Sequence, residues 1–426
     1  MATLSRLVLL STLLSAVISK ALYPQSIQRP PGILHDFQKN NVSTSWAPGH
    51  PKEWSEKEAL KFQFSDGGPH TYTSGAIPAT ALSSDEKFLV TVNISNHVSV
   101  IDFATGSVVS NPSFTTTYSR ESSAVRVLSA PSGGYDVLIS MGYQEVQRLR
   151  LSAQGKQTGN ATIYTGGLLS EFGSSSVSHS GRRFLTVDPN IPQYNIYDLD
   201  DTNVHIILKN QNDVYHDGSF STDDKYVITL SRSYYDTPPR TKLFDATTGA
   251  LVRDFGSTSS EYVRLSPDGK LLATTYSWDA VQLWPLTNAT SEPITLNLPA
   301  HAGRGFSDLQ WSPDGEYLAA GIWGQLVVWK IFPSPQVVQS YQQDNDYHDV
   351  TALLWLEASK RIAYRTFGGL EIYDFDSNLK YRWGFGANSH WADSVYQKGY
   401  TFLSTSKKWI GGLDADAIVR FWEYPA

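Results

Sequence analysis

Short apolar segments alternate with clusters of polar turn residues along most of the chain, beginning near residue 61. Each unit reads as a strand, a tight turn, a second strand, a second turn and a third strand that ends in a polar residue. Alternation with a period of two, together with many β-branched and aromatic residues, predicts β-strands. Long stretches rich in Ala, Glu, Lys and Leu are missing, so the pattern predicts an all-β protein.

The third strand of each unit shows the repeat best, because its last residue can be matched from unit to unit. The matched positions are Asp102, Arg150, Asp198, Asp245, Pro285, Lys330, Asp374 and Glu423. They are 48, 48, 47, 40, 45, 44 and 49 residues apart. Spacing of this kind is typical of the blades of a β-propeller.

The turn after the first strand repeats as well. Ser266–Gly269 and Ser312–Gly315 both read Ser-Pro-Asp-Gly, in which Pro presets φ, Asp caps the turn and Gly takes a positive φ. Weaker versions are predicted at Ser84–Lys87, His179–Gly181 and Thr222–Lys225.

Two of these units resemble WD40 repeats. Residues 263–284 read VRLSPDGKLLATTYSWDAVQLW, residues 306–329 read FSDLQWSPDGEYLAAGIWGQLVVW, and residues 409–422 (WIGGLDADAIVRFW) are similar. The resemblance implies a single propeller of four-stranded blades over residues 61–426. WD40 rings most often have seven blades, but the eight matched third strands, at about 44 residues a blade, favour eight over seven. The resemblance also implies a binding platform, because WD40 propellers mostly bind partners. The last unit ends without an outermost strand, so residues 60–64 are expected to close the ring.

The N-terminus has the pattern of a secretory signal peptide. Arg6 precedes the apolar run Leu7–Ile18, and small residues at Ser19 and Ala21 indicate cleavage near Ala21. We therefore expect a signal peptide over 1–21, an extended arm over 22–60 that runs along the surface, and a secreted protein without a membrane span.

Four N-x-Ser/Thr sequons follow the apolar run, and a secreted chain would carry N-linked glycans at them. They are Asn41, Asn93, Asn160 and Asn288. The chain has no Cys, which excludes thiolate chemistry and disulfides. The net charge of −7, without any basic run, argues against nucleic acid as a partner. No metal or other cofactor is expected, and the protein is expected to be a monomer.

Catalytic signatures are scarce: the chain has no G-x-S-x-G, no H-E-x-x-H, no P-loop and no dinucleotide fingerprint. One constellation stands out, because the tripeptide Tyr-His-Asp occurs twice, each time just before a predicted innermost strand. Loops at that place surround one mouth of a propeller channel. The candidate ligand-binding residues are Tyr215, His216, Asp217, His301, Arg304, Tyr347, His348, Asp349, His390, Trp391, Trp278 and Trp323.

The residues of the predicted mouth have three interpretations, one structural and two functional. A histidine at this place of a WD40 repeat is more often a hydrogen-bonding residue within its blade than a ligand. If the mouth is functional, it binds a protein, a glycan or a small molecule. Alternatively it serves a lyase, hydrolase or cyclisation enzyme of a natural-product pathway, because His, Asp and aromatic groups suffice for such chemistry.

Overall fold

The computed structural model describes only part of the chain, and every structural statement below concerns that part. The described residues are 33–35, 45–50, 52–53, 60–63, 79–92, 96–116, 122–141, 145–165, 177–188, 193–201, 203–209, 215–231, 240–257, 262–276, 280–286, 291–298, 305–322, 325–342, 350–356, 361–366, 369–384, 401–403, 409–413 and 418–423. The chain divides into two compact units, Met1–Ile33 and Leu34–Ala426, and the second contains almost all described residues.

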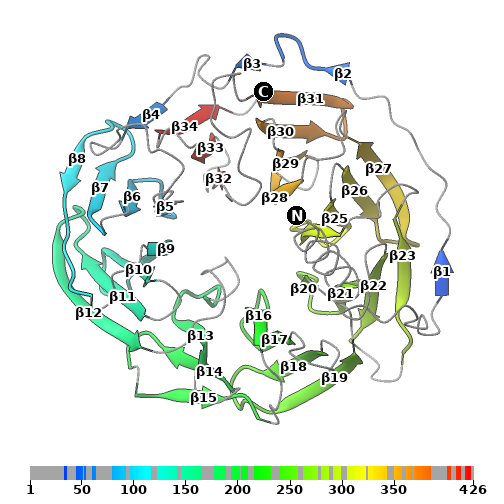
Figure 1. Ribbon diagram of the computed structural model, residues 1–426, viewed down its shortest axis with the longest axis horizontal. Coiled ribbons are helices and arrows are strands. Elements are labelled where there is room, and N and C mark those ends of the chain that lie inside the picture. The colour runs from blue at the N-terminus through cyan, green and yellow to red at the C-terminus, as the bar shows by residue number, and fades with distance from the viewer. Residues whose placement is uncertain are drawn as a thin grey trace, which may run out of the picture. The chain divides into compact units, whose positions relative to one another are not determined.

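The described strands of the second unit form eight sheets, numbered here in chain order, with each innermost strand toward the centre of a ring (Figure 1). The first sheet contains β5 (Ala79–Leu82), β6 (Phe88–Val92), β7 (Val98–Asp102) and β8 (Val108–Ser110). The second contains β9 (Ser122–Ser129), β10 (Tyr135–Met141), β11 (Glu145–Leu151) and β12 (Gln157–Thr165). The third contains β13 (Arg183–Asp188), β14 (Gln193–Asp198) and β15 (His205–Ile207). The fourth contains β16 (Tyr215–Phe220), β17 (Tyr226–Ser231), β18 (Arg240–Asp245) and β19 (Leu251–Ser257).

The remaining four sheets continue around the ring. The fifth contains β20 (Val263–Leu265), β21 (Leu271–Tyr276), β22 (Ala280–Pro285), β23 (Ile294–Asn297) and the N-terminal strand β1 (Ile33–His35). The sixth contains β24 (Phe306–Trp311), β25 (Tyr317–Ile322), β26 (Gln325–Lys330) and β27 (Gln336–Gln342). The seventh contains β28 (Thr351–Leu356), β29 (Arg361–Thr366), β30 (Gly369–Asp374) and β31 (Leu379–Gly384), with β2 (Ser45–Trp46) and β3 (Lys52–Glu53) beside β31. The eighth contains β32 (Thr401–Leu403), β33 (Trp409–Leu413), β34 (Ile418–Glu423) and β4 (Leu60–Gln63).

The predicted fold class, a ring of four-stranded WD40-like blades, needs correction. The protein is an all-β propeller of mostly four-stranded sheets, but the third sheet has three described strands, the fifth has five and the seventh has six. In the third sheet the innermost position holds only an isolated bridge from Val177 to Phe184. The fifth and seventh sheets are larger because N-terminal strands extend their outer edges.

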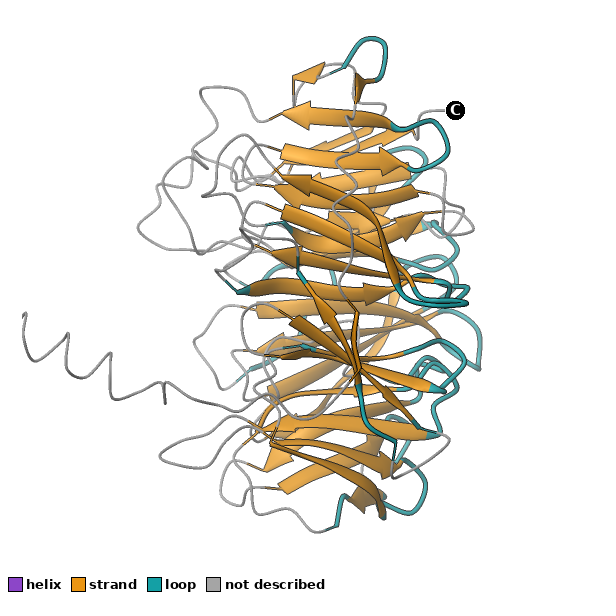
Figure 2. Cartoon of the chain, turned by 90° about the vertical axis from the view of Figure 1, so that its right-hand side faces the viewer, coloured by secondary structure: helices purple, strands orange, loops and turns teal. Residues whose placement is uncertain are grey.

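The two Ser-Pro-Asp-Gly turns are confirmed, whereas the three weaker turns begin one residue earlier than predicted, at Ser83, Ser178 and Ser221. Gly269 and Gly315 take positive φ angles of 68° and 72°, and Glu86 and Asp224 take the same conformation at their equivalent places. In the Ser-Pro-Asp-Gly turn, Ser266 Oγ donates to Asp268 Oδ1 at 2.7 Å and accepts from Leu271 N at 2.9 Å. Seen from the side, the described loops project mostly from one side of the sheets (Figure 2).

The hydrophobic core is divided into eight clusters, one in each gap between successive sheets. The gap between the fifth and sixth sheets contains an extensive cluster, with Leu283, Leu309 and Trp329 fully buried. The gap between the second and third sheets contains a smaller cluster around Leu138 and Phe184. Because each sheet buries both faces against its neighbours, no sheet can be stable alone, and the ring must close.

Ring closure uses an N-terminal strand, as the sequence predicted. Strand β4 pairs antiparallel with β34, with Phe62 opposite Val419. The eighth sheet is thereby completed from the opposite end of the chain. Its free edge would otherwise remain open to another strand.

The segment before β4, expected to run along the surface, also joins a sheet. Strands β2 and β3 pair in parallel with β31, and Ala47 is 3% exposed in the core of the seventh and eighth sheets. Lys380 Nζ lies 4.2 Å from the centre of the Trp46 ring. His50 Nδ1 lies 3.1 Å from the backbone N of Arg382. These short strands fix the segment to the rim of the ring.

Candidate functional site

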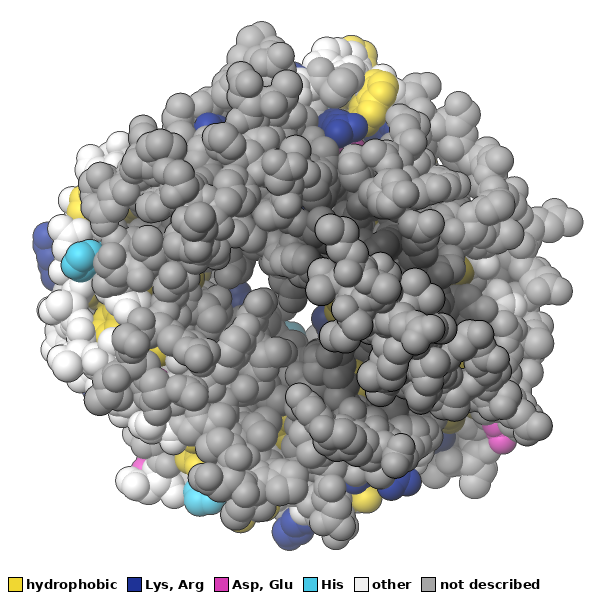
Figure 3. Space-filling model, viewed as in Figure 1, with side chains coloured by type: hydrophobic (Ala, Val, Ile, Leu, Met, Phe, Trp, Pro, Cys, Tyr) yellow, Lys and Arg dark blue, Asp and Glu magenta, His cyan; other side chains and the backbone are white. Residues whose placement is uncertain are grey.

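Most residues of the predicted mouth lie outside the described part of the chain. These are His301, Arg304, Tyr347, His348, Asp349, His390, Trp391, Trp278 and Trp323, and the sequons Asn41, Asn93 and Asn288 lie outside it as well. The structure therefore does not test whether these side chains lie together, and the site remains a prediction. Figure 3 shows the face of the ring seen in Figure 1, with an opening at its centre.

Tyr215, His216 and Asp217 are the part of the predicted mouth whose backbone is described. We expected them in a loop before the innermost strand, but they form the beginning of that strand, β16. The pairing with β17 shifts register between Tyr215 and Asp217, so His216 occupies a bulge. A bulge redirects a side chain at the rim of a sheet, which is frequent beside functional sites.

The same irregularity follows two other predicted mouth loops. Strand β24 comes directly after the loop with His301 and Arg304, and its register shifts between Phe306 and Asp308. Strand β28 comes after the second Tyr-His-Asp tripeptide, and its register shifts between Thr351 and Leu354. Three innermost strands therefore bulge at the end where the predicted mouth loops lead into them.

Tryptophan side chains join the innermost strands of the fifth, sixth and seventh sheets. Trp311 Nε1 donates to Arg264 O at 3.0 Å, and Trp355 Nε1 donates to Gln310 O at 3.3 Å. The two hydrogen bonds are equivalent in the repeat, because each links the end of an innermost strand to the innermost strand of the preceding sheet. They connect the innermost strands of neighbouring sheets to one another.

Asp308 connects two innermost strands at the bulged end of β24. Its Oδ2 accepts from Leu353 N of β28 at 2.8 Å, and its Oδ1 lies 3.8 Å from Arg264 Nη2 of β20. The Asp308 side chain is 12% exposed and that of Arg264 20%. The Asp308 carboxylate thus links β24 to both β20 and β28 beside the bulge of β24.

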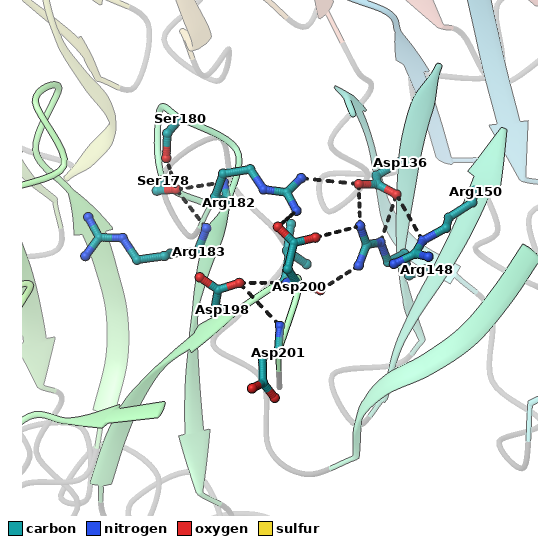
Figure 4. Close-up of polar contacts among 11 residues, drawn as sticks. Asp136, Arg148, Arg150, Ser178, Ser180, Arg182, Arg183, Asp198, Asp200 and Asp201 are labelled. Atoms are coloured by element: carbon teal, nitrogen blue, oxygen red, sulfur yellow. Dashed lines mark hydrogen bonds and ion pairs between the residues drawn. The ribbon is translucent and has the colours of Figure 1, made fainter. Parts of the chain in front are cut away.

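A second polar group, the Arg–Asp cluster of Asp136, Arg148, Arg182 and Asp200, lies between the second and third sheets (Figure 4). Arg148 Nε and Nη2 donate to the two carboxylate oxygens of Asp136 at 2.8 and 2.6 Å, a bidentate geometry. Arg148 Nη1 donates to Leu199 O at 2.5 Å. The side chains of Asp136 and Arg148 are 1% and 6% exposed, so this is a buried ion pair.

The outer half of the Arg–Asp cluster is closer to solvent. Arg182 Nη1 lies 3.3 Å from Asp136 Oδ2, and its Nη2 forms an ion pair with Asp200. The hydrogen bond from Arg182 lowers the pKa of Asp200, although partial burial opposes this. Every member of the Arg–Asp cluster has a charged partner, so the cluster links the second sheet to the third.

The sequence contained a sign of this cluster that the motif search missed. Two residues before each matched third-strand end, seven of the eight units carry a buried apolar residue. These residues are Val100, Ile196, Leu243, Leu283, Val328, Ile372 and Phe421. The second unit carries Arg148 there, and an arginine in a position that is otherwise apolar indicates a buried acidic partner.

Membrane and metal features are not found among the described residues. That part of the chain contains no helix with the length and apolar character to cross a membrane. It also contains no cluster of three or more His, Cys, Asp or Glu side chains that could hold a metal ion.

Comparison with known proteins defines the fold. No family model matches the chain, and no curated protein matches it. Among solved structures, the chain is similar to the C-terminal WD40 domain of Sif2, with a TM-score of 0.59 and 11% identity over 87% of this chain and 98% of that one. The protein therefore has the WD40-like β-propeller fold, and at this identity the similarity extends to the fold alone.

Proposed function

We propose that the protein is a secreted glycoprotein that binds a small molecule, a glycan or a protein at the channel mouth formed by the loops before the innermost strands. The observation that carries this proposal is the set of bulges at the beginning of β16, β24 and β28. A bulge changes the direction of a side chain while the strand continues beyond it. Such a change at the start of an innermost strand can direct a side chain toward a ligand at the mouth. A propeller fold also supports it, because propellers commonly bind partners at one face.

The experiment compares two double variants in affinity selection. Purified protein is incubated with the small-molecule fraction of the producing cells' medium, and retained compounds are identified by mass spectrometry. His216→Ala with His348→Ala should lose a compound that the wild-type protein retains. The matched control, His179→Ala with His205→Ala, removes two exposed imidazoles from the opposite turns and the rim and should retain it.

Two results would contradict the mouth as the binding site. If both double variants retain the compound equally, binding occurs elsewhere on the ring. If the His216 and His348 variant unfolds, as shown by loss of its cooperative thermal transition, these histidines are structural residues of their blades. His216→Gln with His348→Gln, which keeps hydrogen-bonding groups, then separates the two roles.

The secretory part of the proposal is supported by the position of Asn160. It lies in β12 and is exposed, so a glycan there meets no packed core. Glycosidase treatment of protein recovered from the medium should increase its gel mobility. An unchanged mobility would contradict secretion through a glycosylating pathway.

A further inference from the structure

The outer edge of the second sheet is the longest strand of the described part. Strand β12 has nine residues, Gln157–Thr165, and pairs with β11 on its inner side only. Its residues carry no charge, and most are exposed or half-buried. An edge of this length and composition is a template for pairing with another chain.

Most other outer edges of the ring are protected by recognisable means, although β27, with seven residues and no charge, is uncovered as well. N-terminal strands cover β23 and β31, and β4 covers β34. Strands β8 and β15 are only three residues long. Strand β19 carries Arg253 and Asp254. Short edges, covered edges and charged edges all resist association, and β12 has none of these protections.

The sequon Asn160 occupies the fourth of the nine positions of β12. It pairs with Leu149 of β11 and is exposed. Its neighbour Gly159 has open space around it, because a Cβ added there would meet nothing within 4 Å. The other neighbour, Ala161, is small and exposed. The surroundings of Asn160 therefore leave room for a bulky substituent at the middle of the edge.

We propose that an N-linked glycan on Asn160 covers the free edge of β12 and prevents its pairing with a second copy of this chain. This inference rests on the proposed passage through a glycosylating secretory pathway. A glycan is large and strongly hydrated, so it excludes a second strand sterically from the edge. It takes the place of the charged residues that protect other edges.

The experiment first establishes whether Asn160 is occupied and then removes the glycan. Peptide mass spectrometry of the secreted protein gives the occupancy. The Asn160→Gln variant and enzymatically deglycosylated wild-type protein are then compared with intact protein by light scattering over a range of concentrations. Intact protein should remain monomeric, whereas both preparations without the Asn160 glycan should shift to dimers and larger species as the concentration rises.

Charge on the edge should substitute for the glycan. Ala161→Lys added to Asn160→Gln places a lysine on β12 and should restore the monomer. Gln154→Lys added to Asn160→Gln is the matched control. It adds the same charge in the exposed turn before β12, so it should leave the association unchanged.

The outcomes separate the two proposals. An unmodified Asn160 in the secreted protein contradicts the glycan and the secretory route together. An occupied Asn160 whose removal leaves the protein monomeric overturns only the role at the edge. Restoration by Gln154→Lys as well as Ala161→Lys also overturns that role, because net charge would then explain the association. If Asn160→Gln does not accumulate as folded protein, the enzymatically deglycosylated wild type decides.

Discussion

The gap between the fifth and sixth sheets and the gap between the second and third sheets solve the same packing problem differently. The former, called here the apolar gap, is filled by side chains such as Leu283, Leu309 and Trp329. The latter, called the charged gap, combines a smaller apolar cluster with the Arg–Asp cluster. Leu283 and Arg148 occupy the same repeat position, so the strand framework tolerates an apolar residue or a charge.

The comparison shows that this repeat position requires a buried side chain, which can be apolar or charged. Leu283 is buried among apolar side chains and needs no polar partner. The guanidinium of Arg148, by contrast, needs the carboxylates of Asp136 and Asp200, which also pair with Arg182. A charge in this position is compatible with the fold because carboxylates lie beside it. The charged gap is therefore more sensitive to the loss of one residue than the apolar gap.

The largest effect is expected from Asp136→Asn. It leaves the buried guanidinium of Arg148 without its bidentate carboxylate, and the free energy of unfolding should fall by about 3–5 kcal/mol. Urea denaturation at pH 7 measures this loss. Glu316→Gln, which neutralises an exposed carboxylate, serves as the control and should change little. Equal effects of the two substitutions would show that Asp136 contributes no more to the free energy of unfolding than an exposed carboxylate does.

In the apolar gap, Leu283→Ala should lower the free energy of unfolding by about 2–5 kcal/mol, since it leaves a cavity in a fully buried position. Because no charge is involved, the loss should be the same in low and high salt. The same denaturation experiment at two salt concentrations tests this. If the loss of unfolding free energy varied with salt, charge would contribute in the apolar gap too, and the proposed difference between the two gaps would be wrong.

Converting the charged gap into an apolar one is the sharpest test of the comparison. Asp136→Leu with Arg148→Leu should be far less destabilising than Asp136→Asn alone, because an apolar pair can replace a buried ion pair at little cost. The expected change is at most about 1.5 kcal/mol. A double variant as unstable as Asp136→Asn would show that Arg148 acts mainly through Leu199 and Asp200.

The smallest effect is expected at Asp200, whose side chain is 58% exposed. The Arg182 hydrogen bond lowers its pKa, so its stabilising effect is complete above the ordinary carboxyl pKa of about 3.9 and is lost as pH falls through the folded-state value. Asp200→Asn should therefore cost at most about 1 kcal/mol at pH 7, and the difference from wild type should shrink on acidification. Asp201→Asn, whose carboxylate accepts from Asn203 instead, is the control. An acid-independent difference at Asp200 would exclude the ion pair as its source.

Much of the fold could be predicted from the sequence because strand spacing and turn chemistry are local. The Ser-Pro-Asp-Gly turns and the closing strand β4 were found in this way. Strands β2 and β3 were missed because each has two residues and depends on β31 for its conformation. The Arg–Asp cluster was missed because motif searches compare neighbours in sequence, whereas Asp136 and Arg182 are brought together only by the packing of two sheets.

The candidate mouth was less predictable for a related reason. The backbone of Tyr215–Asp217 was placed in a loop, yet it begins a strand with a bulge, and a bulge leaves no clear pattern in a single sequence. The other candidate residues lie outside the described part, so the mouth remains a prediction.

Closure by β4 also has a consequence for synthesis of the chain. Residues 60–63 are made long before their partner β34, which lies at residues 418–423. The ring therefore cannot close until β34 has left the ribosome, and this contact carries a large loop-closure entropy. Until then the nascent chain exposes unpaired strand edges, which are prone to aggregation. The pairing of β4 with β34 joins two segments that lie far apart in sequence, so loss of either strand opens the same edge of the eighth sheet.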